Sequence, residues 1–243
     1  ASASLFLLYK LLPLDTGIWH GILAGIGIFT FIGSNLLGIA QKNANRLLGY
    51  SSVGQIGMLV AVIGFELMLK EYFNLVFFTL FISHFLAKAG LFWLSGIIKK
   101  EGISEWALLR KNKILVFLFG LFVFTLIGFP PLPSFYGKWQ LVMTFAHQHS
   151  FAWIILILLG SFFEGLYLFR WLGYVLKEAY NENENLHFGL EQLIPPVVFA
   201  VAVLAASYYA NSISVLGTSI NLILLYFILF LFNVDFLPAY VKN

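Results

Sequence analysis

An apolar segment of this chain contains the sequence Gly128-Phe129-Pro130-Pro131-Leu132-Pro133-Ser134-Phe135-Tyr136-Gly137-Lys138. Three prolines in four positions cannot continue a helix, because proline has no backbone N–H and its ring clashes with the preceding turn. Residues 114–129 and 134–146 are each too short to cross a bilayer alone, since a span needs ~20 residues. The sequence therefore predicts one discontinuous helix over 114–146. It is broken at Pro130, Pro131 and Pro133.

The composition predicts a membrane protein. The chain has 243 residues, of which 60% are hydrophobic and only 10% are charged, whereas soluble domains carry about 25% charged residues. A soluble domain of this size cannot bury so much apolar surface, so we expect an all-α, polytopic transmembrane helix bundle with roughly seven spans. The absence of Cys excludes disulfides, haem thiolates and iron–sulfur ligation by this chain.

Apolar runs between breakers define the expected spans. They lie at about 17–40, 50–69, 72–98, 114–146, 150–176 and 192–211, after a partial helix over 1–12. An eighth segment over 213–238 has a short apolar centre and fits either a span or an interfacial helix. The chain opens on Ala1 without an initiator Met, so we expect further sequence upstream. This division suggests one unit over 1–176 and a loop with one or two helices over 177–243.

Basic residues set the expected orientation. Alternating spans place most Lys and Arg in the 41–49, 99–113 and 177–191 loops, and only Lys10 and Lys70 on the other side. Loops rich in Lys and Arg stay in the cytoplasm. The three loops are therefore predicted to be cytoplasmic, and Arg170 is expected to meet headgroups on that side.

Four ionisable residues fall where lipid is expected, and each costs several kcal/mol there, ~2.5–3.5 for a Lys or Asp at mid-bilayer. They are His84, Lys88, Lys138 and Glu164. His84 and Lys88 are four residues apart and so share a helix face. A histidine titrates near neutrality and a desolvated amine gives up its proton more readily, so this pair could relay protons. Alternatively, His84 bonds a neighbouring helix and Lys88 reaches the interface.

Lys138 directly follows the break, and broken helices mark ion sites in transporters. The alternative there is a loop that joins two short spans. Glu164 needs a partner if it is buried, and Lys138 or Lys88 could supply it; the alternative is a protonated Glu with no role in transfer. Five polar residues are candidates to line a path, although the α-helical glycines beside some of them also fit close packing. They are Ser51, Ser52, Gln55, Thr79 and Ser83.

Three segments carry a family resemblance. They are Asn45-Arg46-Leu47-Leu48-Gly49-Tyr50-Ser51-Ser52-Val53-Gly54-Gln55-Ile56-Gly57, Ser83-His84-Phe85-Leu86-Ala87-Lys88-Ala89-Gly90-Leu91-Phe92-Trp93-Leu94-Ser95-Gly96, and 128–139. In the same order they resemble segments of the proton-translocating antiporter-like subunits of respiratory complex I, membrane-bound hydrogenases and Mrp-type cation/proton antiporters. The resemblance covers most of residues 15–176.

This resemblance implies a fold of inverted five-helix repeats, of which residues 1–176 are similar to the second. Lys138 matches the broken-helix lysine that passes protons outward, and Lys88 with His84 matches the central groups of the hydrophilic axis. The implied function is that of a proton-translocating subunit of a redox-driven complex. The alternatives are an Mrp-type Na⁺/H⁺ antiporter subunit and a structural membrane subunit that conducts nothing.

The resemblance also implies the surroundings of the chain. We expect no cofactor in this chain, with flavin, Fe–S or NiFe centres only in partner subunits. The expected partners are other membrane subunits, lipids, protons and Na⁺, in a prokaryotic inner membrane. The net charge is only +3, so nucleic acid is not an expected partner.

Overall fold

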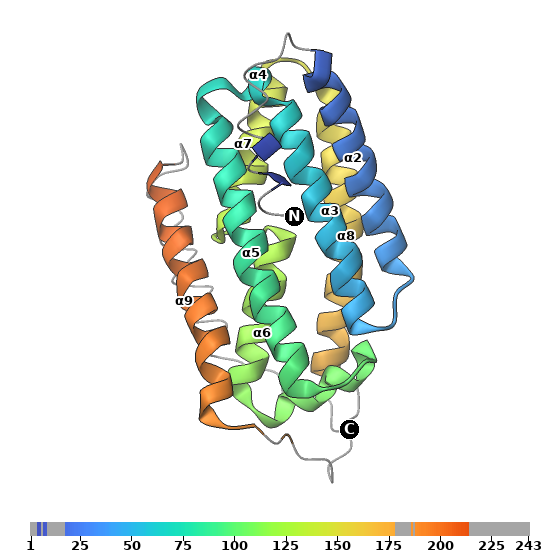
Figure 1. The fold of residues 1–243 in the computed structure, drawn as a ribbon, viewed down its shortest axis with the longest axis vertical. Coiled ribbons are helices and arrows are strands. Elements are labelled where there is room, and N and C mark those ends of the chain that lie inside the picture. The colour runs from blue at the N-terminus through green and yellow to red at the C-terminus, as the bar shows by residue number, and fades with distance from the viewer. Residues whose placement is uncertain (1–3, 6, 9–17, 178–185, 187, 214–243) are drawn as a thin grey trace, which may run out of the picture.

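Figure 1 shows the computed structural model, a bundle of long helices that run along its longest axis. It describes residues 4–5, 7–8, 18–177, 186 and 188–213. Most of the predicted helix 1–12, and all of the predicted segment 213–238 except Ile213, lie outside these residues. The main helices are α2 (Ile18–Ile39), α3 (Ala44–Gly64), α4 (Glu66–Leu69), α5 (Phe73–Ile98), α6 (Lys113–Ile127), α7 (Pro133–His147), α8 (Phe151–Lys177) and α9 (Leu190–Ile213).

Five helical segments in the described part of the chain are long and apolar enough to cross a membrane. They are Ile18–Ile39, Ala44–Gly64, Glu66–Ile98, Phe151–Lys177 and Leu190–Ala210. Their outer faces carry large apolar side chains such as Phe29, Phe85 and Phe162, which are exposed in the chain alone. This arrangement suits hydrocarbon rather than water, and it confirms the predicted all-helical membrane bundle.

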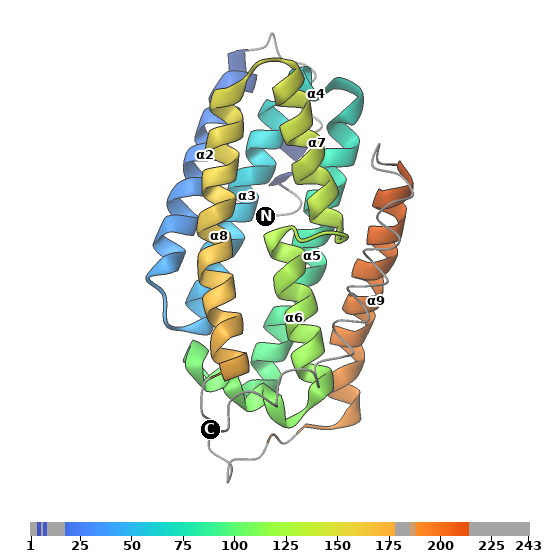
Figure 2. The same cartoon turned by 180° about the vertical axis from the view of Figure 1, so that it is seen from behind.

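The helix over 114–146 is interrupted at the three prolines. Seen from behind, α6 and α7 follow one another along the bundle, with the break at mid-height (Figure 2). α6 ends at Ile127, and α7 begins at Pro133. A proline in the first turn of a helix is tolerated because its missing N–H would have no partner there. The prolines therefore stop one helix and start the next.

The span predicted over 50–69 begins earlier than expected. We predicted a start near residue 50 after a loop over 41–49, but α3 begins at Ala44. Asn43 caps the helix, since its side-chain oxygen accepts a hydrogen bond from the backbone N–H of Arg46 at 3.1 Å. Hydropathy alone missed this start because Asn45 and Arg46 interrupt the apolar run, whereas the cap is what starts the helix.

Replacing Asn43 by Ala should lower the free energy of unfolding by about 1 kcal/mol, because one backbone N–H of α3 loses its acceptor. The measurement is equilibrium unfolding in mixed detergent micelles. Asn43→Ser keeps an oxygen acceptor and should stay close to the parent protein. An equal loss in both variants would show that the cap is not the cause.

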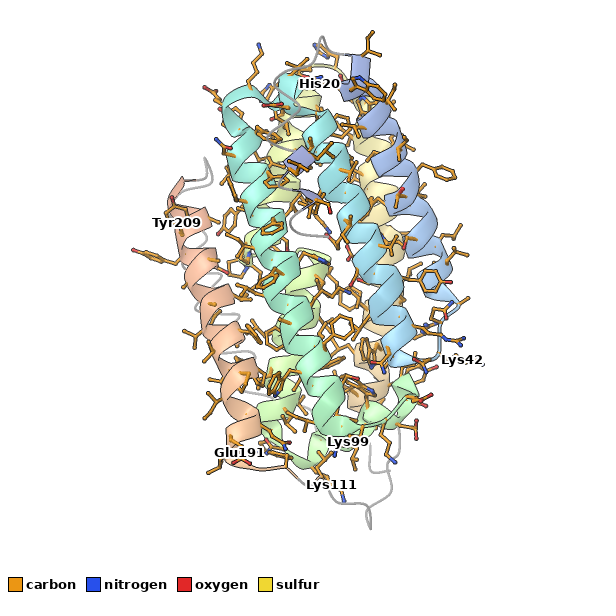
Figure 3. All side chains as sticks on the ribbon, viewed as in Figure 1. His20, Lys42, Lys99, Lys111, Glu191 and Tyr209 are labelled. Carbon is orange, nitrogen blue, oxygen red and sulfur yellow. The ribbon has the colours of Figure 1, made fainter. Side chains whose placement is uncertain are left out.

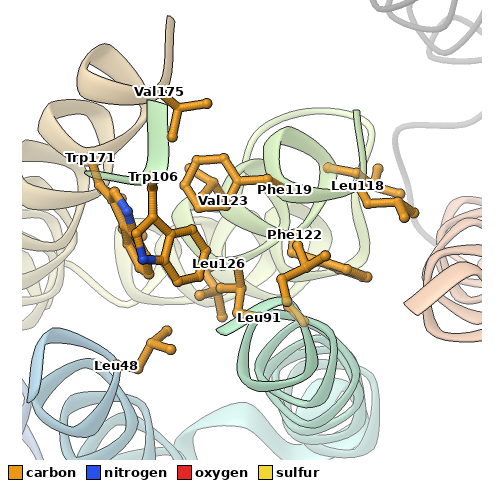
Figure 4. Close-up of a cluster of buried hydrophobic side chains, with 14 of the residues drawn as sticks. Leu48, Leu91, Trp106, Leu118, Phe119, Phe122, Val123, Leu126, Trp171 and Val175 are labelled. Carbon is orange, nitrogen blue, oxygen red and sulfur yellow. The ribbon is translucent and has the colours of Figure 1, made fainter. Parts of the chain in front are cut away.

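The 99–113 segment, predicted as a loop, contains a short helix. Residues Ile103–Lys111 form a 3₁₀-helix, η3, and Trp106 within it is fully buried. Its ring centroid lies 4.5 Å from that of Trp171 and 5.5 Å from that of Phe119, in the cluster drawn in Figure 4. The third predicted loop, over 177–191, also ends earlier, because α9 begins at Leu190.

Two connections close the same end of the bundle. The N–H of Ala44 donates to the carbonyl of Glu101 at 2.7 Å, and the N–H of Ile103 donates to that of Lys42 at 2.9 Å. Lys42, Lys99 and Lys111 lie at this end, which we call the basic end, and His20 lies at the opposite one (Figure 3). The backbone pairing fixes the two basic segments against each other.

Arg170 does not reach outward to headgroups as expected. Its guanidinium donates to the carbonyl oxygens of Ile39 and of Gln41, the latter at 2.6 Å. These carbonyls lie at and just beyond the C-terminus of α2, where helix carbonyls have no partner of their own. Arg170 therefore ties α8 to the end of α2.

Candidate functional site

The break between α6 and α7 leaves carbonyl groups of α6 without helical partners, and side chains of α7 bind them. Ser134 donates its hydroxyl hydrogen bond to the carbonyl of Thr125. Lys138 Nζ donates to the carbonyl of Ile127 at 3.1 Å. Irregular backbone at membrane depth is tolerated where protein groups satisfy it. Lys138 is therefore part of the break, because its amine binds a carbonyl that the break leaves without a helical partner.

Gly128 allows the Lys138 side chain to lie against the break. Its φ of +85° is in the left-handed region, which favours glycine. A Cβ added at Gly128 would also lie 3.1 Å from the Cδ of Lys138. The backbone turn and the room for the lysine side chain thus both depend on the lack of a side chain at this position.

Lys138 forms an ion pair with Glu164 of α8. Lys138 Nζ lies 3.2 Å from Glu164 Oε2, and the two side chains are 12% and 0% exposed. The other carboxylate oxygen, Oε1, accepts a hydrogen bond from Gln55 Nε2 of α3 at 2.5 Å. Of the two lysines considered for Glu164, Lys138 is the direct partner. Three helices thus meet at one buried carboxylate.

Lys88 of α5 also lies inside the bundle, with 5% of its surface exposed. Its Nζ donates to the carbonyl oxygen of Leu48 on α3 at 3.1 Å, and it interacts electrostatically with Glu164. The amine therefore does not extend to the interface, which was the alternative to a buried role. Both lysines act on the same carboxylate, one by direct contact and one at longer range.

His84 lies one turn from Lys88 on α5 and is half-buried. Its Nδ1 is shielded from solvent, and among the described residues it has no hydrogen-bond partner. The alternative to a relay role was a hydrogen bond from His84 to a neighbouring helix. Nδ1 does not make such a bond.

The predicted lining residues divide into two kinds. Thr79 donates to the carbonyl of Leu75 at 2.6 Å, and Ser83 and Ser52 likewise bond carbonyls four residues earlier in their own helices. Gln55 of α3 instead bonds Glu164, and Ser51, one turn away, is buried near Tyr167 with no hydrogen-bond partner in the described part of the chain. Only the latter two join the buried cluster through their side chains.

Sequence reasoning missed two members of the cluster. Tyr167 and Asn35 are fully buried, and the Tyr167 hydroxyl donates to Asn35 Oδ1 at 2.8 Å. The available signal was the spacing of Tyr167 three residues after Glu164, which places both along one side of α8. Asn35 gave a weaker signal, as an amide inside an apolar helix.

No group of three or more His, Asp or Glu side chains that could hold a metal ion occurs in the described ranges. The site thus consists of one carboxylate, two amines, an imidazole, amides and hydroxyls on α2, α3, α5, α7 and α8. Such groups exchange protons or bind water and small cations.

The family model described as NADH:quinone oxidoreductase/Mrp antiporter, transmembrane, matches residues 1–164. The chain belongs to this family. It is 27% identical over 219 residues to NADH-quinone oxidoreductase subunit N 2 of Hydrogenobaculum sp., an alignment that covers 86% of this chain and 46% of that protein. The chain thus spans about half the length of this curated relative.

Solved structures show the same antiporter-like fold. The membrane-bound sulfane sulfur reductase, an archaeal respiratory membrane complex, contains a chain that matches with a TM-score of 0.70 and 18% identity. The match covers 92% of this chain and 42% of that chain. The Mrp complex of Dietzia sp. matches with a TM-score of 0.66 and 21% identity, over 86% of this chain and 25% of that one. At these identities the likeness establishes the fold alone.

Proposed function

We propose that this chain is part of a proton-translocating subunit of a redox-driven membrane complex, and that residues 1–176 are its second repeat. The observation that carries the proposal is the Lys138–Glu164 ion pair at the break of the helix, 3.2 Å long and almost fully buried. An ion pair inside a membrane protein is expensive to bury, so a packing role alone explains it poorly. A role in moving protons requires such groups.

The cluster suits a relay. Glu164 shares its two oxygens between Lys138 and Gln55, and Lys88 acts on it from α5. When one lysine loses its proton, the pull of the carboxylate on the other lysine changes, because charges interact strongly in a medium of low dielectric. His84 lies one turn before Lys88 on α5 and adds a further titratable group beside it. The protonation state of one amine can therefore change the proton affinity of the other amine.

The surroundings follow from this proposal. The partners are other membrane subunits and lipids, and any flavin, Fe–S or NiFe centre lies in those subunits. The 41–43 and 99–112 connections at the basic end face the cytoplasm, and the membrane is a prokaryotic inner membrane. The family's name also covers Mrp antiporters, so Na⁺/H⁺ exchange is the second candidate function.

The test is Lys138→Ala in the assembled complex. We expect coupled proton uptake by inverted membrane vesicles to collapse while the subunits still assemble, because Glu164 loses its partner and the chain loses an amine at the break. Lys42→Ala, at an exposed lysine of the basic end, should leave uptake unchanged. Normal uptake in Lys138→Ala would instead indicate a structural subunit. A requirement for Na⁺ in the same assay would indicate antiport.

A further inference from the structure

Polar side chains continue from Glu164 along α8 toward the basic end. Glu164, Tyr167 and Arg170 follow one another at intervals of three residues, so they form a row along the helix. We infer that Tyr167 is a proton-conducting residue that connects the Lys138–Glu164 pair with the α2–α3 connection. This inference rests on the proposed function and adds to it a route on the cytoplasmic side.

The hydroxyl of Tyr167 has the contacts that a relay needs. It donates to Asn35 Oδ1 at 2.8 Å and interacts electrostatically with Glu164. The nearby Ser51 hydroxyl is buried and has no hydrogen-bond partner among the described residues. A hydroxyl group both donates and accepts hydrogen bonds, so it can accept a proton from a water molecule on the carboxylate side and release its own proton to a water molecule on the other side, while the phenol itself stays neutral. Asn35 in turn donates from Nδ2 to the carbonyl of Gly160 at 3.3 Å, which fixes the amide.

The ring of Tyr167 is held in one position. A Cβ added at Gly38 would lie 3.0 Å from its Cε1, so the ring packs directly on the backbone of α2. Close approach of helix backbones through glycine is common in membrane bundles. The hydroxyl is therefore placed by packing of the ring, independently of the hydrogen bond that it makes.

The row reaches the basic end through Arg170. The guanidinium binds the carbonyls of Ile39 and Gln41, next to the exposed Lys42. On α3, Ser51 and Gln55 form a parallel row one turn apart, beside Tyr167 and Glu164 respectively. Polar groups on α2, α3 and α8 thus recur from the carboxylate to the loop. Buried hydrogen bonds can also simply hold helices together, and the experiment has to separate the two roles.

The first experiment is Tyr167→Phe in the assembled complex, with proton uptake by inverted membrane vesicles as the measurement. Phe keeps the ring against Gly38 and removes only the hydroxyl, so assembly should persist while uptake falls by about tenfold or more, as expected when a proton-transfer group is lost. The matched control is Tyr136→Phe on α7. That phenol is equally buried and has no hydrogen-bond partner in the described part of the chain, so uptake should not change.

The second experiment uses the absence of Cys from the whole sequence. A thiol reacts only as the thiolate, which requires water. Ser51→Cys should therefore be modified by a small, membrane-permeant methanethiosulfonate, and the modification should block uptake. Ser207→Cys, at a buried serine of α9 that bonds Val203, should stay unmodified.

Uptake at the parental rate in Tyr167→Phe would overturn the inference, whatever the reactivity at position 51. If Tyr167→Phe fails to assemble, the label decides: modification of Ser51→Cys supports the route, and its absence rejects it. The proposed function is tested separately by Lys138→Ala. Loss of uptake in Lys138→Ala together with normal uptake in Tyr167→Phe would reject this route and keep the function.

Discussion

In Lys138→Met, the free energy of unfolding should fall by about 3 kcal/mol, because the fully buried carboxylate of Glu164 loses the cation 3.2 Å away. In the double variant Lys138→Met/Glu164→Gln, most of this loss should be recovered. The glutamine is neutral, and its oxygen can still accept the hydrogen bond from Gln55. Proton uptake should be absent from both variants, since neither retains the amine of Lys138.

Stability and transport thus separate in the double variant. The measurements are equilibrium unfolding in mixed detergent micelles and proton uptake by inverted vesicles with the assembled complex. The cycle is completed by the single variant Glu164→Gln. If the losses of stability in Lys138→Met and Glu164→Gln add up to the loss in the double variant, Lys138 and Glu164 do not interact energetically. Uptake by the double variant would show that the pair is only a structural cross-link.

Gly27→Leu should prevent α2 from packing on α3, and Gly27→Ala should already destabilise the bundle by about 3 kcal/mol. A Cβ at Gly27 would lie 2.4 Å from the backbone nitrogen of Ala61 and 2.6 Å from the carbonyl oxygen of Gly57. These are backbone atoms, so the helices would have to move apart. That movement would also shift Asn35 and Gln55, and uptake should fall with stability.

Gly25→Ala is the matched control for the contact between α2 and α3. It makes the same change two residues away on the same helix, where a Cβ would meet nothing within 4 Å. Its unfolding free energy should equal or slightly exceed that of the parent, because Ala favours the helix over Gly. Equal losses at both positions would mean that helix propensity, rather than contact between α2 and α3, sets the cost.

Elements with strong local signals were predictable. The prolines at 130, 131 and 133 stop a helix wherever they occur, and the break is where they place it. The apolar runs gave α2, α5, α8 and α9 within a few residues. The start of α3 and the burial of Trp106 were not predictable in this way. They depend on a cap and on a cluster with Trp171 and Phe119, which come from distant parts of the chain.

The candidate site divides in the same manner. An ionisable residue inside an apolar run is visible in the sequence, because its cost in a bilayer does not depend on its neighbours. Lys88, Lys138 and Glu164 were found for this reason. Tyr167 and Asn35 were not, since phenols and amides are common in helices and become notable only when partners surround them.

By itself, then, the sequence determined that this protein enters a membrane, where its helices break and which charged groups lie at depth, because each depends on local composition and on the solvent. Only the tertiary structure decided that Glu164 pairs with Lys138 while Lys88 binds the carbonyl of Leu48. It also decided that Arg170 binds the end of α2 instead of headgroups. These choices depend on how far each helix is rotated and shifted against its neighbours, and the packing of glycines and rings across many residues sets those positions.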